Sequence, residues 1–430
     1  MSWLLFALGL WCGALLVNGF RPVRRNRVLF AASFFTAWLT IEAAPIWLLV
    51  WPALTALLVW AGALERLVGW VGLVLVAAWW IGLVVLYLQG RGTTATATTA
   101  FGDFGREVLD GRDRPGRHKV RVERNIEFRK EAGRRLKLDV YRPTEPAPPG
   151  ARRPVILQIH GGAWVIGDKR EQGLPLLKYL ASHGWVGFNV NYRLSPGATF
   201  PDHLVDVKAA LAWIREHADT YLIDPDFVVV TGGSAGGHLA ALMGLTANDP
   251  AYQPGFEDAD TSVQAAVPFY GIYDFTNRSD NSPPEMLTWI LEPLVMKAFL
   301  ADDPEAFRRA SPLDRVHADA PPFLIVHGDK DTLAPVDDAR LFAADLRAVS
   351  HSEVIYIELH GAQHAFDVFG SPRTRRMVSA VERFLFTVHD AYEHHPEAAL
   401  APPIDGSAPE AVDPPTGDRA AEPSPPLASR

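Results

Sequence analysis

The sequence of 430 residues contains a single cysteine, Cys12. One cysteine excludes an intrachain disulfide framework and a metal site built from several cysteines. Basic residues are also fewer than acidic ones, with 41 Lys and Arg against 49 Asp and Glu and a formal net charge of −8. Because this balance leaves no broad basic surface, we expect no nucleic-acid partner.

Charged side chains are almost absent from the first 90 residues, where nine of the thirteen tryptophans lie. Three long apolar runs fill this region, at residues 3–20, 28–64 and 68–88. A transmembrane helix needs about 20 apolar residues. A cleaved signal peptide fits poorly, because the basic cluster follows the first run instead of preceding it. We therefore expect residues 1–90 to form transmembrane helices; a bundle of buried soluble helices is the alternative.

The middle run decides the topology. It contains Glu42 and Pro45, and forms either one kinked helix or two helices that meet near Glu42, which gives three or four spans. Arginines follow the first run, and more basic residues follow the last one between Arg91 and Lys119. Three spans would put both basic segments in the cytoplasm. We expect this multi-pass arrangement in the cell membrane, with a cytoplasmic catalytic domain. Glu42 either functions within a span or lies at a kink or an interface.

The arginines that follow the first run are Arg21, Arg24, Arg25 and Arg27, and those that follow the last run include Arg106, Arg112, Arg114 and Arg117.

The remaining chain divides into three parts. Residues 91–119 are rich in Gly, Thr and Arg and are expected to form a linker. Over residues 120–392, a pair of strands is followed by short apolar runs that alternate with helical segments, which predicts an α/β domain with a doubly wound, mainly parallel sheet. The alternation breaks at 274–311, where we expect a helical cap insertion. The Pro- and Ala-rich tail, 393–430, cannot bury enough apolar surface and is expected to be disordered.

One serine lies in a context typical of a nucleophile. The run from Phe227 to Ala240 reads as a strand, then Gly232-x-Ser234-x-Gly236, then an apolar helix. Such a turn holds the serine exposed at the carboxyl end of the strand, and the helix N-terminus behind it favours negative charge. A plain glycine-rich turn is the alternative, but the strand before it and the helix after it favour a nucleophile.

Candidates for the base and the acid follow two later strands. A serine is a weak nucleophile without such partners, and in this architecture their order along the chain is serine, acid, histidine. One predicted strand is followed by Asp329 and Asp331, and the last one by His360 and His364. We favour Asp331 over Asp329. We favour His364 over His360, because His364 lies far enough into its loop to reach back to Ser234.

Oxyanion stabilisation is the remaining requirement. His160-Gly-Gly-Ala-Trp164 follows another predicted strand. The backbone N–H groups of Gly161, Gly162 and Ala235 are candidates for the oxyanion hole, in which one donor is typically worth about 10²–10³ in rate. We expect His160 to stabilise the loop and not to transfer a proton. Trp164 either lines the substrate pocket or packs beneath it.

These motifs together resemble the hormone-sensitive-lipase-like and carboxylesterase branch of the α/β hydrolases over about residues 120–389. The motifs are His160-Gly-Gly-x-Trp, Asn191-Tyr-Arg-Leu-Ser, Phe200-Pro…Asp206, Gly-Gly-Ser234-Ala-Gly-Gly, His327-Gly-Asp-x-Asp-x-Leu-x-Pro and Gly-x-x-His364-Ala-Phe.

The resemblance implies a triad of Ser234, Asp331 and His364, and hydrolysis of short to medium acyl esters without a metal or organic cofactor. The third glycine that is usual in this branch is Ala163 here. The His-Gly-Gly-x-Trp form is similar to that of kynurenine formamidases and isoprenylcysteine methylesterases.

The leading hypothesis is a membrane-anchored serine esterase that acts on a small-molecule, lipid-like or short to medium acyl ester. An amide or formamide hydrolase is the first alternative, suggested by His-Gly-Gly-x-Trp. The second is a non-catalytic α/β-hydrolase scaffold that serves as a membrane interaction module, which the ordered serine, acid and histidine disfavour. The physiological substrate and the oligomeric state do not follow from the sequence.

Overall fold

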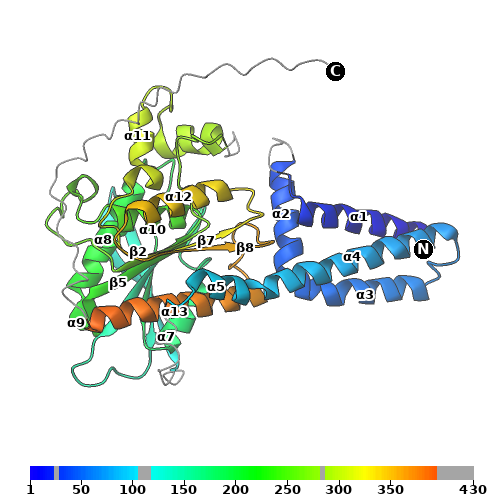
Figure 1. Cartoon of the computed structure of the whole chain (residues 1–430), viewed down its shortest axis with the longest axis horizontal. Coiled ribbons are helices and arrows are strands. Elements are labelled where there is room, and N and C mark those ends of the chain that lie inside the picture. The colour runs from blue at the N-terminus through cyan, green and yellow to red at the C-terminus, as the bar shows by residue number, and fades with distance from the viewer. Residues whose placement is uncertain (24–28, 105–117, 281–285, 395–430) are drawn as a thin grey trace, which may run out of the picture.

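The computed structural model describes residues 1–23, 29–104, 118–280 and 286–394. Figure 1 shows two regions, a group of long apolar helices and a domain built on one sheet, which we call the sheet domain (residues 118–394). The predicted disordered tail after residue 394 lies outside the described residues. So do the basic residues at 24–28 and 105–117.

Four helices form the N-terminal region: α1 (Ser2–Phe20), α2 (Phe30–Glu42), α3 (Ala44–Trp60) and α4 (Leu67–Arg91). By length and composition, two helices, α1 and the one that begins with α4, are suited to cross a membrane, or up to three if the α2–α3 pair is one span. The middle apolar run therefore forms two helices, which meet at an angle of 87°.

Helices α1, α3 and α4 lie side by side and extend away from the sheet domain, and we call them the helical bundle (Figure 1). Glycines allow α1 and α4 to pack closely. A Cβ on Gly9 would lie 2.8 Å from the carbonyl oxygen of Gly72, and a Cβ on Gly72 would lie 2.6 Å from the nitrogen of Phe6. Small residues at such contacts are typical of helices that associate within membranes.

Helix α2 lies across the end of the helical bundle that meets the sheet domain (Figure 1). Glu42 is its last residue, at the bend into α3, and its carboxylate lies 2.6 Å from Nη1 of Arg373. Both side chains are at most 3% exposed. Breaking a buried ion pair of this kind costs about 3–5 kcal/mol, so Glu42 ties the N-terminal region to the sheet domain.

The sheet has eight strands in the order β1-β2-β4-β3-β5-β6-β7-β8. The β1–β2 and β2–β4 pairs are antiparallel and all the others are parallel. This confirms the predicted doubly wound, mainly parallel sheet that follows an initial pair of strands. The strands are β1 (Val120–Glu131), β2 (Arg134–Pro143), β3 (Arg153–Ile159), β4 (Val186–Val190), β5 (Ile223–Gly233), β6 (Ala265–Phe269), β7 (Phe323–Gly328) and β8 (Val354–Leu359).

Helices cover both faces of the sheet, so the parallel strands are buried on both sides and read as continuous apolar runs. One face is packed by α8 (Asp202–Glu216), α10 (Ala235–Leu245) and α12 (Val336–Val349). The other is packed by α7 (Leu174–Ser182) and α13 (Pro372–His394). The short α9 (Ala218–Tyr221) and the 3₁₀ turn η1 (Pro250–Tyr252) complete the connections.

Part of the expected linker is ordered. Residues 93–101 form helix α5 (Thr93–Phe101), which continues from α4. Ala97 and Phe101 are buried in the same apolar cluster as Phe384 and Val388 of α13. The Thr-rich composition suggested a loop, but packing against α13 stabilises the helix.

The expected cap contains a wide-turned π-helix, η2 (Met286–Met296), and then α11 (Pro304–Arg309). The 3₁₀ turn η3 (Pro312–Arg315) follows directly after it. Pro293 lies within η2, which is not a regular α-helix. Leu291 and Val295 are buried in the main apolar cluster of the sheet domain, and the carbonyl of Val295 accepts a hydrogen bond from Phe200 N–H at 2.9 Å.

Candidate active site

Ser234 lies between the end of β5 and the start of α10, in a conformation that non-glycine residues rarely adopt. Its φ is 59°, and its N–H donates to the carbonyl of Phe269 at 3.0 Å. The flanking glycines are required, because a Cβ on Gly232 would lie 2.6 Å from the Ile159 carbonyl oxygen and one on Gly236 2.8 Å from that of His160. This strained turn presents a serine side chain at the carboxyl end of a buried strand, as a nucleophile requires.

His364 and Asp331 follow β8 and β7 and form a buried pair. Nδ1 of His364 lies 2.7 Å from Oδ2 of Asp331, and the N–H groups of Leu333 and Ala334 donate to Oδ1 of Asp331, each at 2.8 Å. Burial by itself would raise the pKa of Asp331, but His364, His327 and their hydrogen bonds outweigh it and hold that pKa well below its usual range. An ionised Asp331 only accepts, so Nδ1 of His364 carries the proton and Nε2 is left to accept one.

The less favoured candidates, Asp329 and His360, also contact each other. Nδ1 of His360 lies 2.7 Å from Oδ2 of Asp329, but the His360 side chain is 66% exposed. A second ring contact of His360, 3.2 Å from Nε2 of Gln89, reaches α4 and not Ser234. The geometry therefore favours Asp331 and His364 as the buried acid–base pair.

Tyr270, which follows β6, lies between the serine turn and the histidine. Its ring centroid is 4.7 Å from that of His364, and a Cβ added to Gly233 would lie 2.5 Å from its hydroxyl oxygen. Among the described residues no hydrogen bond joins Ser234 to His364. Catalytic hydrogen bonds are often long without substrate and tighten when it binds.

The loop after β3 departs from one expectation. Gly161 N–H already donates to Oε1 of Gln172 at 2.7 Å, so it is not available for an oxyanion. By contrast, the N–H groups of Gly162 and Ala163 have no acceptor within the described part of the chain. Ala235 begins α10, and the first N–H groups of a helix lack intrahelical acceptors. Gly162, Ala163 and Ala235 are therefore the candidate donors.

Comparison with known proteins extends this picture. Residues 138–346 match the family model described as BD-FAE. A probable carboxylic ester hydrolase of Mycobacterium tuberculosis, LipM, is 50% identical over 276 residues, which are 64% of this chain and 63% of LipM. Esterase LipQ of the same organism is 48% identical over 257 residues, 60% of either chain. The chain thus spans less than two thirds of the length of these relatives.

Solved structures share the sheet domain. A truncated carbohydrate esterase from gut microbiota is 25% identical, with a TM-score of 0.51 over 63% of this chain and 98% of that chain. Esterase 2 of Thermogutta terrifontis, phosphonylated by sarin, is 27% identical, with a TM-score of 0.50 over 68% of this chain and 98% of that chain. The sheet domain has the α/β-hydrolase fold.

Two aromatic residues of the sheet domain lie beneath the candidate site. Trp164 is fully buried, and its Nε1–H donates to Nδ1 of His238 at 3.3 Å, so its side chain packs in the core and does not line an open pocket. His160 stacks on Tyr192 at 4.5 Å between ring centroids, and burial lowers the pKa of His160. Its Nδ1 lies 2.7 Å from the Gly161 carbonyl, so His160 stabilises the loop.

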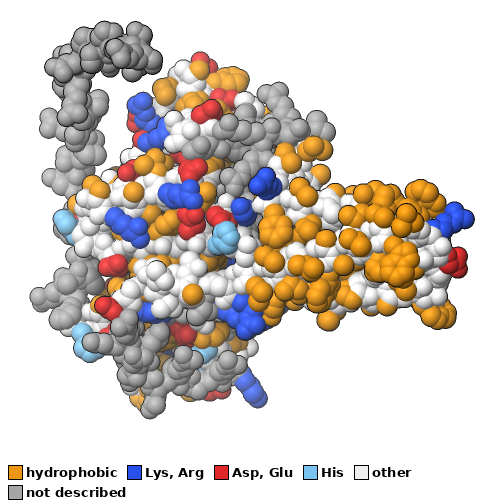
Figure 2. Space-filling model, turned by 45° about the vertical axis from the view of Figure 1, so that its right-hand side comes forward, with side chains coloured by type: hydrophobic (Ala, Val, Ile, Leu, Met, Phe, Trp, Pro, Cys, Tyr) orange, Lys and Arg blue, Asp and Glu red, His pale blue; other side chains and the backbone are white. Residues whose placement is uncertain are grey.

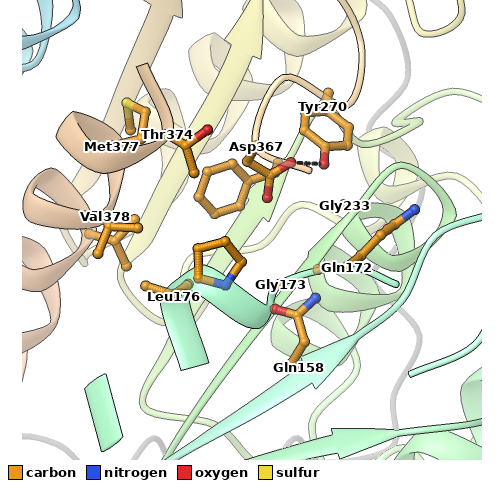
Figure 3. A pocket seen from close by; sticks show the side chains of 14 residues that line it. Gln158, Gln172, Gly173, Leu176, Gly233, Tyr270, Asp367, Thr374, Met377 and Val378 are labelled. Atoms are coloured by element: carbon orange, nitrogen blue, oxygen red, sulfur yellow. Dashed lines mark hydrogen bonds between the residues drawn. The ribbon is translucent and has the colours of Figure 1, made fainter. Parts of the chain in front are cut away.

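Sequence reasoning missed Gln172, Tyr270 and Asp367. Figure 3 shows them around a pocket beside Gly233, where the hydroxyl of Tyr270 donates to Asp367. Burial and then the nearby carboxylate of Asp367 raise the pKa of Tyr270 well above its usual range, and burial raises that of Asp367. Asp367 is three residues after His364 in the sequence, and this spacing was the one signal that it lies near the candidate site. Within the described residues, no group of three or more His, Cys, Asp and Glu could hold a metal ion.

Proposed function

We propose that this chain is a serine hydrolase that cleaves carboxylic esters, with Ser234 as nucleophile, His364 as general base and Asp331 as its orienting acid. The observation that carries the proposal is the buried 2.7 Å contact between Asp331 and His364, together with a serine whose φ is 59°. The names of the relatives, a carboxylic ester hydrolase and an esterase, support the choice of esters.

The reaction follows from these positions. Nε2 of His364 takes the proton of Ser234 as its Oγ attacks the carbonyl carbon, and Asp331 stabilises the imidazolium. The N–H groups of Gly162, Ala163 and Ala235 stabilise the oxyanion. His364 then protonates the leaving alcohol, and water hydrolyses the acyl-enzyme by the same steps in reverse order.

The N-terminal helices extend this proposal to a membrane-anchored enzyme. Their lipid-facing positions carry large apolar side chains that are more than half exposed, such as Trp3, Leu49 and Trp60. Figure 2 shows apolar side chains over most of the visible face of the helical bundle and fewer on that of the sheet domain. Exposed surface of this kind is stable in lipid and not in water. We infer a substrate that is an apolar or lipid-like ester near the bilayer.

A labelling and turnover experiment tests the activity. The full chain in detergent is treated with a fluorophosphonate probe and assayed on p-nitrophenyl esters of increasing chain length. We expect labelling and turnover in the wild type, neither in Ser234→Ala, and a loss in kcat of about 10⁴ in Asp331→Asn, because the wrong His364 tautomer is then held. A folded protein that is neither labelled nor active overturns the proposal, and faster turnover of formyl amides overturns the ester assignment.

A further inference from the structure

A second cavity lies away from Ser234, where the end of α4, the helix α5 and the start of α13 meet. Its volume is about 710 Å³, within the range of small-molecule sites. Among the described residues, four arginines line it and no Asp or Glu does: Arg91, Arg375, Arg376 and Arg383. Such a concentration of one charge is unusual in a chain whose net charge is −8, and it favours an anionic ligand.

Three of these arginines keep donors for a ligand. Arg375 donates through Nη1 to the carbonyl of Gly370 at 2.8 Å, and Arg376 to that of Pro372 at 3.3 Å. Within the described ranges, no carboxylate pairs with Arg91, Arg375 or Arg376. Each guanidinium has five N–H donors in a fork that suits phosphate, so one backbone contact leaves several of them available.

The fourth arginine has a structural role. Arg383 donates to the carbonyl of Phe104 and lies over the ring of Phe101, 4.8 Å from its centroid. These contacts hold α5 against α13, so Arg383 shapes the wall of the cavity.

The cavity also has a fixed position relative to the helical bundle. Arg91 is the last residue of α4, and Tyr87 lies one turn before it on the same cavity wall. Tyr and Arg at the end of an apolar span are typical of the headgroup level of a membrane. Figure 2 shows basic side chains at the base of the helical bundle, where it meets the sheet domain.

We propose that this cavity binds the headgroup of an anionic phospholipid, with Arg91, Arg375 and Arg376 donating to its phosphate. Ala97, Phe101 and Ala380 supply an apolar wall in the same cavity, which suits the glycerol and first methylene groups of a lipid and which a free phosphate ion does not need. Basic pockets beside transmembrane helices are known to hold such headgroups. The proposal rests on the membrane anchoring proposed above.

The test uses the full chain in detergent and follows its thermal unfolding as phosphatidylglycerol, phosphatidylcholine or inorganic phosphate is added. We expect phosphatidylglycerol alone to raise the unfolding temperature at low concentration. Each arginine near an anionic lipid contributes about fivefold in affinity. The variant Arg91→Gln with Arg375→Gln and Arg376→Gln should therefore need roughly a hundredfold more phosphatidylglycerol for the same rise, while its ester hydrolysis is retained.

The matched control removes three exposed arginines elsewhere on the sheet domain, Arg121→Gln with Arg135→Gln and Arg308→Gln, and should respond like the wild type. The lipid site is overturned if both triple variants lose the response to phosphatidylglycerol equally. It is also overturned if phosphatidylcholine, or inorganic phosphate at the same concentration, raises the unfolding temperature as much as phosphatidylglycerol does. Flotation with phosphatidylcholine vesicles tests the anchor separately. A chain that does not float contradicts the anchor. A chain that floats, but whose unfolding temperature does not respond preferentially to phosphatidylglycerol, contradicts only the headgroup site.

Discussion

At the scale of single residues, the side chain of Gln172 fixes the loop that follows β3. Its Oε1 accepts the N–H of Gly161 at 2.7 Å, and the next residue in that loop is Gly162, a candidate oxyanion donor. A displacement of 1 Å in such a group costs about 10² in rate. We predict that Gln172→Ala lowers kcat by roughly tenfold to a hundredfold on a p-nitrophenyl ester with little change in KM.

Gln172→Glu is the matched control, because a carboxylate of the same length keeps an acceptor for Gly161 N–H. It should recover most of the lost kcat. Equal losses in the two variants would mean that Gln172 acts by filling space and not by holding Gly161.

His238 gives a prediction for pH at the same scale. It is fully buried, and burial lowers its pKa to about 3 from an ordinary value of 6.5. Below about pH 6.5 the unfolded chain takes up a proton at His238 that the folded form excludes. The free energy of unfolding is therefore unaffected by His238 above that pH and decreases as the pH falls from 6.5 toward 3. The loss is about 1.4 kcal/mol per pH unit for one histidine.

Thermal unfolding of the full chain in detergent between pH 7.5 and 4.5 measures this effect. His203 has the same burial and a pKa of about 3, so His238→Gln should reduce the pH dependence of the unfolding temperature only in part. An unchanged pH dependence in His238→Gln would contradict the assignment.

At the scale of elements, α2 holds the loop that carries His364. Nε1–H of Trp38 donates to the carbonyl of Ala365 at 3.0 Å, and its ring lies 4.7 Å from that of Phe369. Phe34 contacts His364 edge-on, at 6.4 Å between ring centroids. A helix of the N-terminal region thus positions a candidate catalytic base.

We predict that Trp38→Ala lowers kcat on a soluble ester by roughly tenfold, because the His364 loop loses a hydrogen bond and a ring contact. Trp38→Phe keeps a ring and should lose less. Phe35→Ala, on the exposed side of α2, is the control and should retain the wild-type kcat. An equal fall in kcat in Trp38→Ala and Phe35→Ala would indicate damage to α2 as a whole and would contradict the prediction.

The elements also show what the sequence can predict. Alternating apolar runs and helices identified the strands that carry Ser234, Asp331 and His364, because the carboxyl ends of parallel strands meet at one edge. Local patterns did not reveal that Gln172 occupies the Gly161 N–H, since that contact depends on how a loop folds back. They also did not reveal α5, whose Thr-rich sequence has weak helix propensity and is stabilised by contacts with distant residues of α13.

At the scale of the whole molecule, the edge of the sheet that carries the candidate site faces the N-terminal helices. The arrows of β7 and β8 in Figure 1 point toward α2, and the candidate acid and base follow those strands. An ester held at the membrane surface would therefore lie near Ser234 without crossing the sheet domain. This arrangement requires the sheet domain and the near end of the helical bundle to be on the same side of the membrane.

The course of the helices gives the last prediction. The N-terminus lies at the far end of the helical bundle (Figure 1). From there α1 runs toward the sheet domain, α3 runs away from it and α4 returns to it. Arg21 and Arg91 both lie at the near end, and segments rich in Lys and Arg stay in the cytoplasm. We predict opposite sides for the two termini: an N-terminal alkaline phosphatase is active outside, and a C-terminal fluorescent protein is bright inside. A variant with glutamine in place of Arg21, Arg24, Arg25 and Arg27 should insert into the membrane in both orientations. Two termini on the same side in the wild type would contradict three spans.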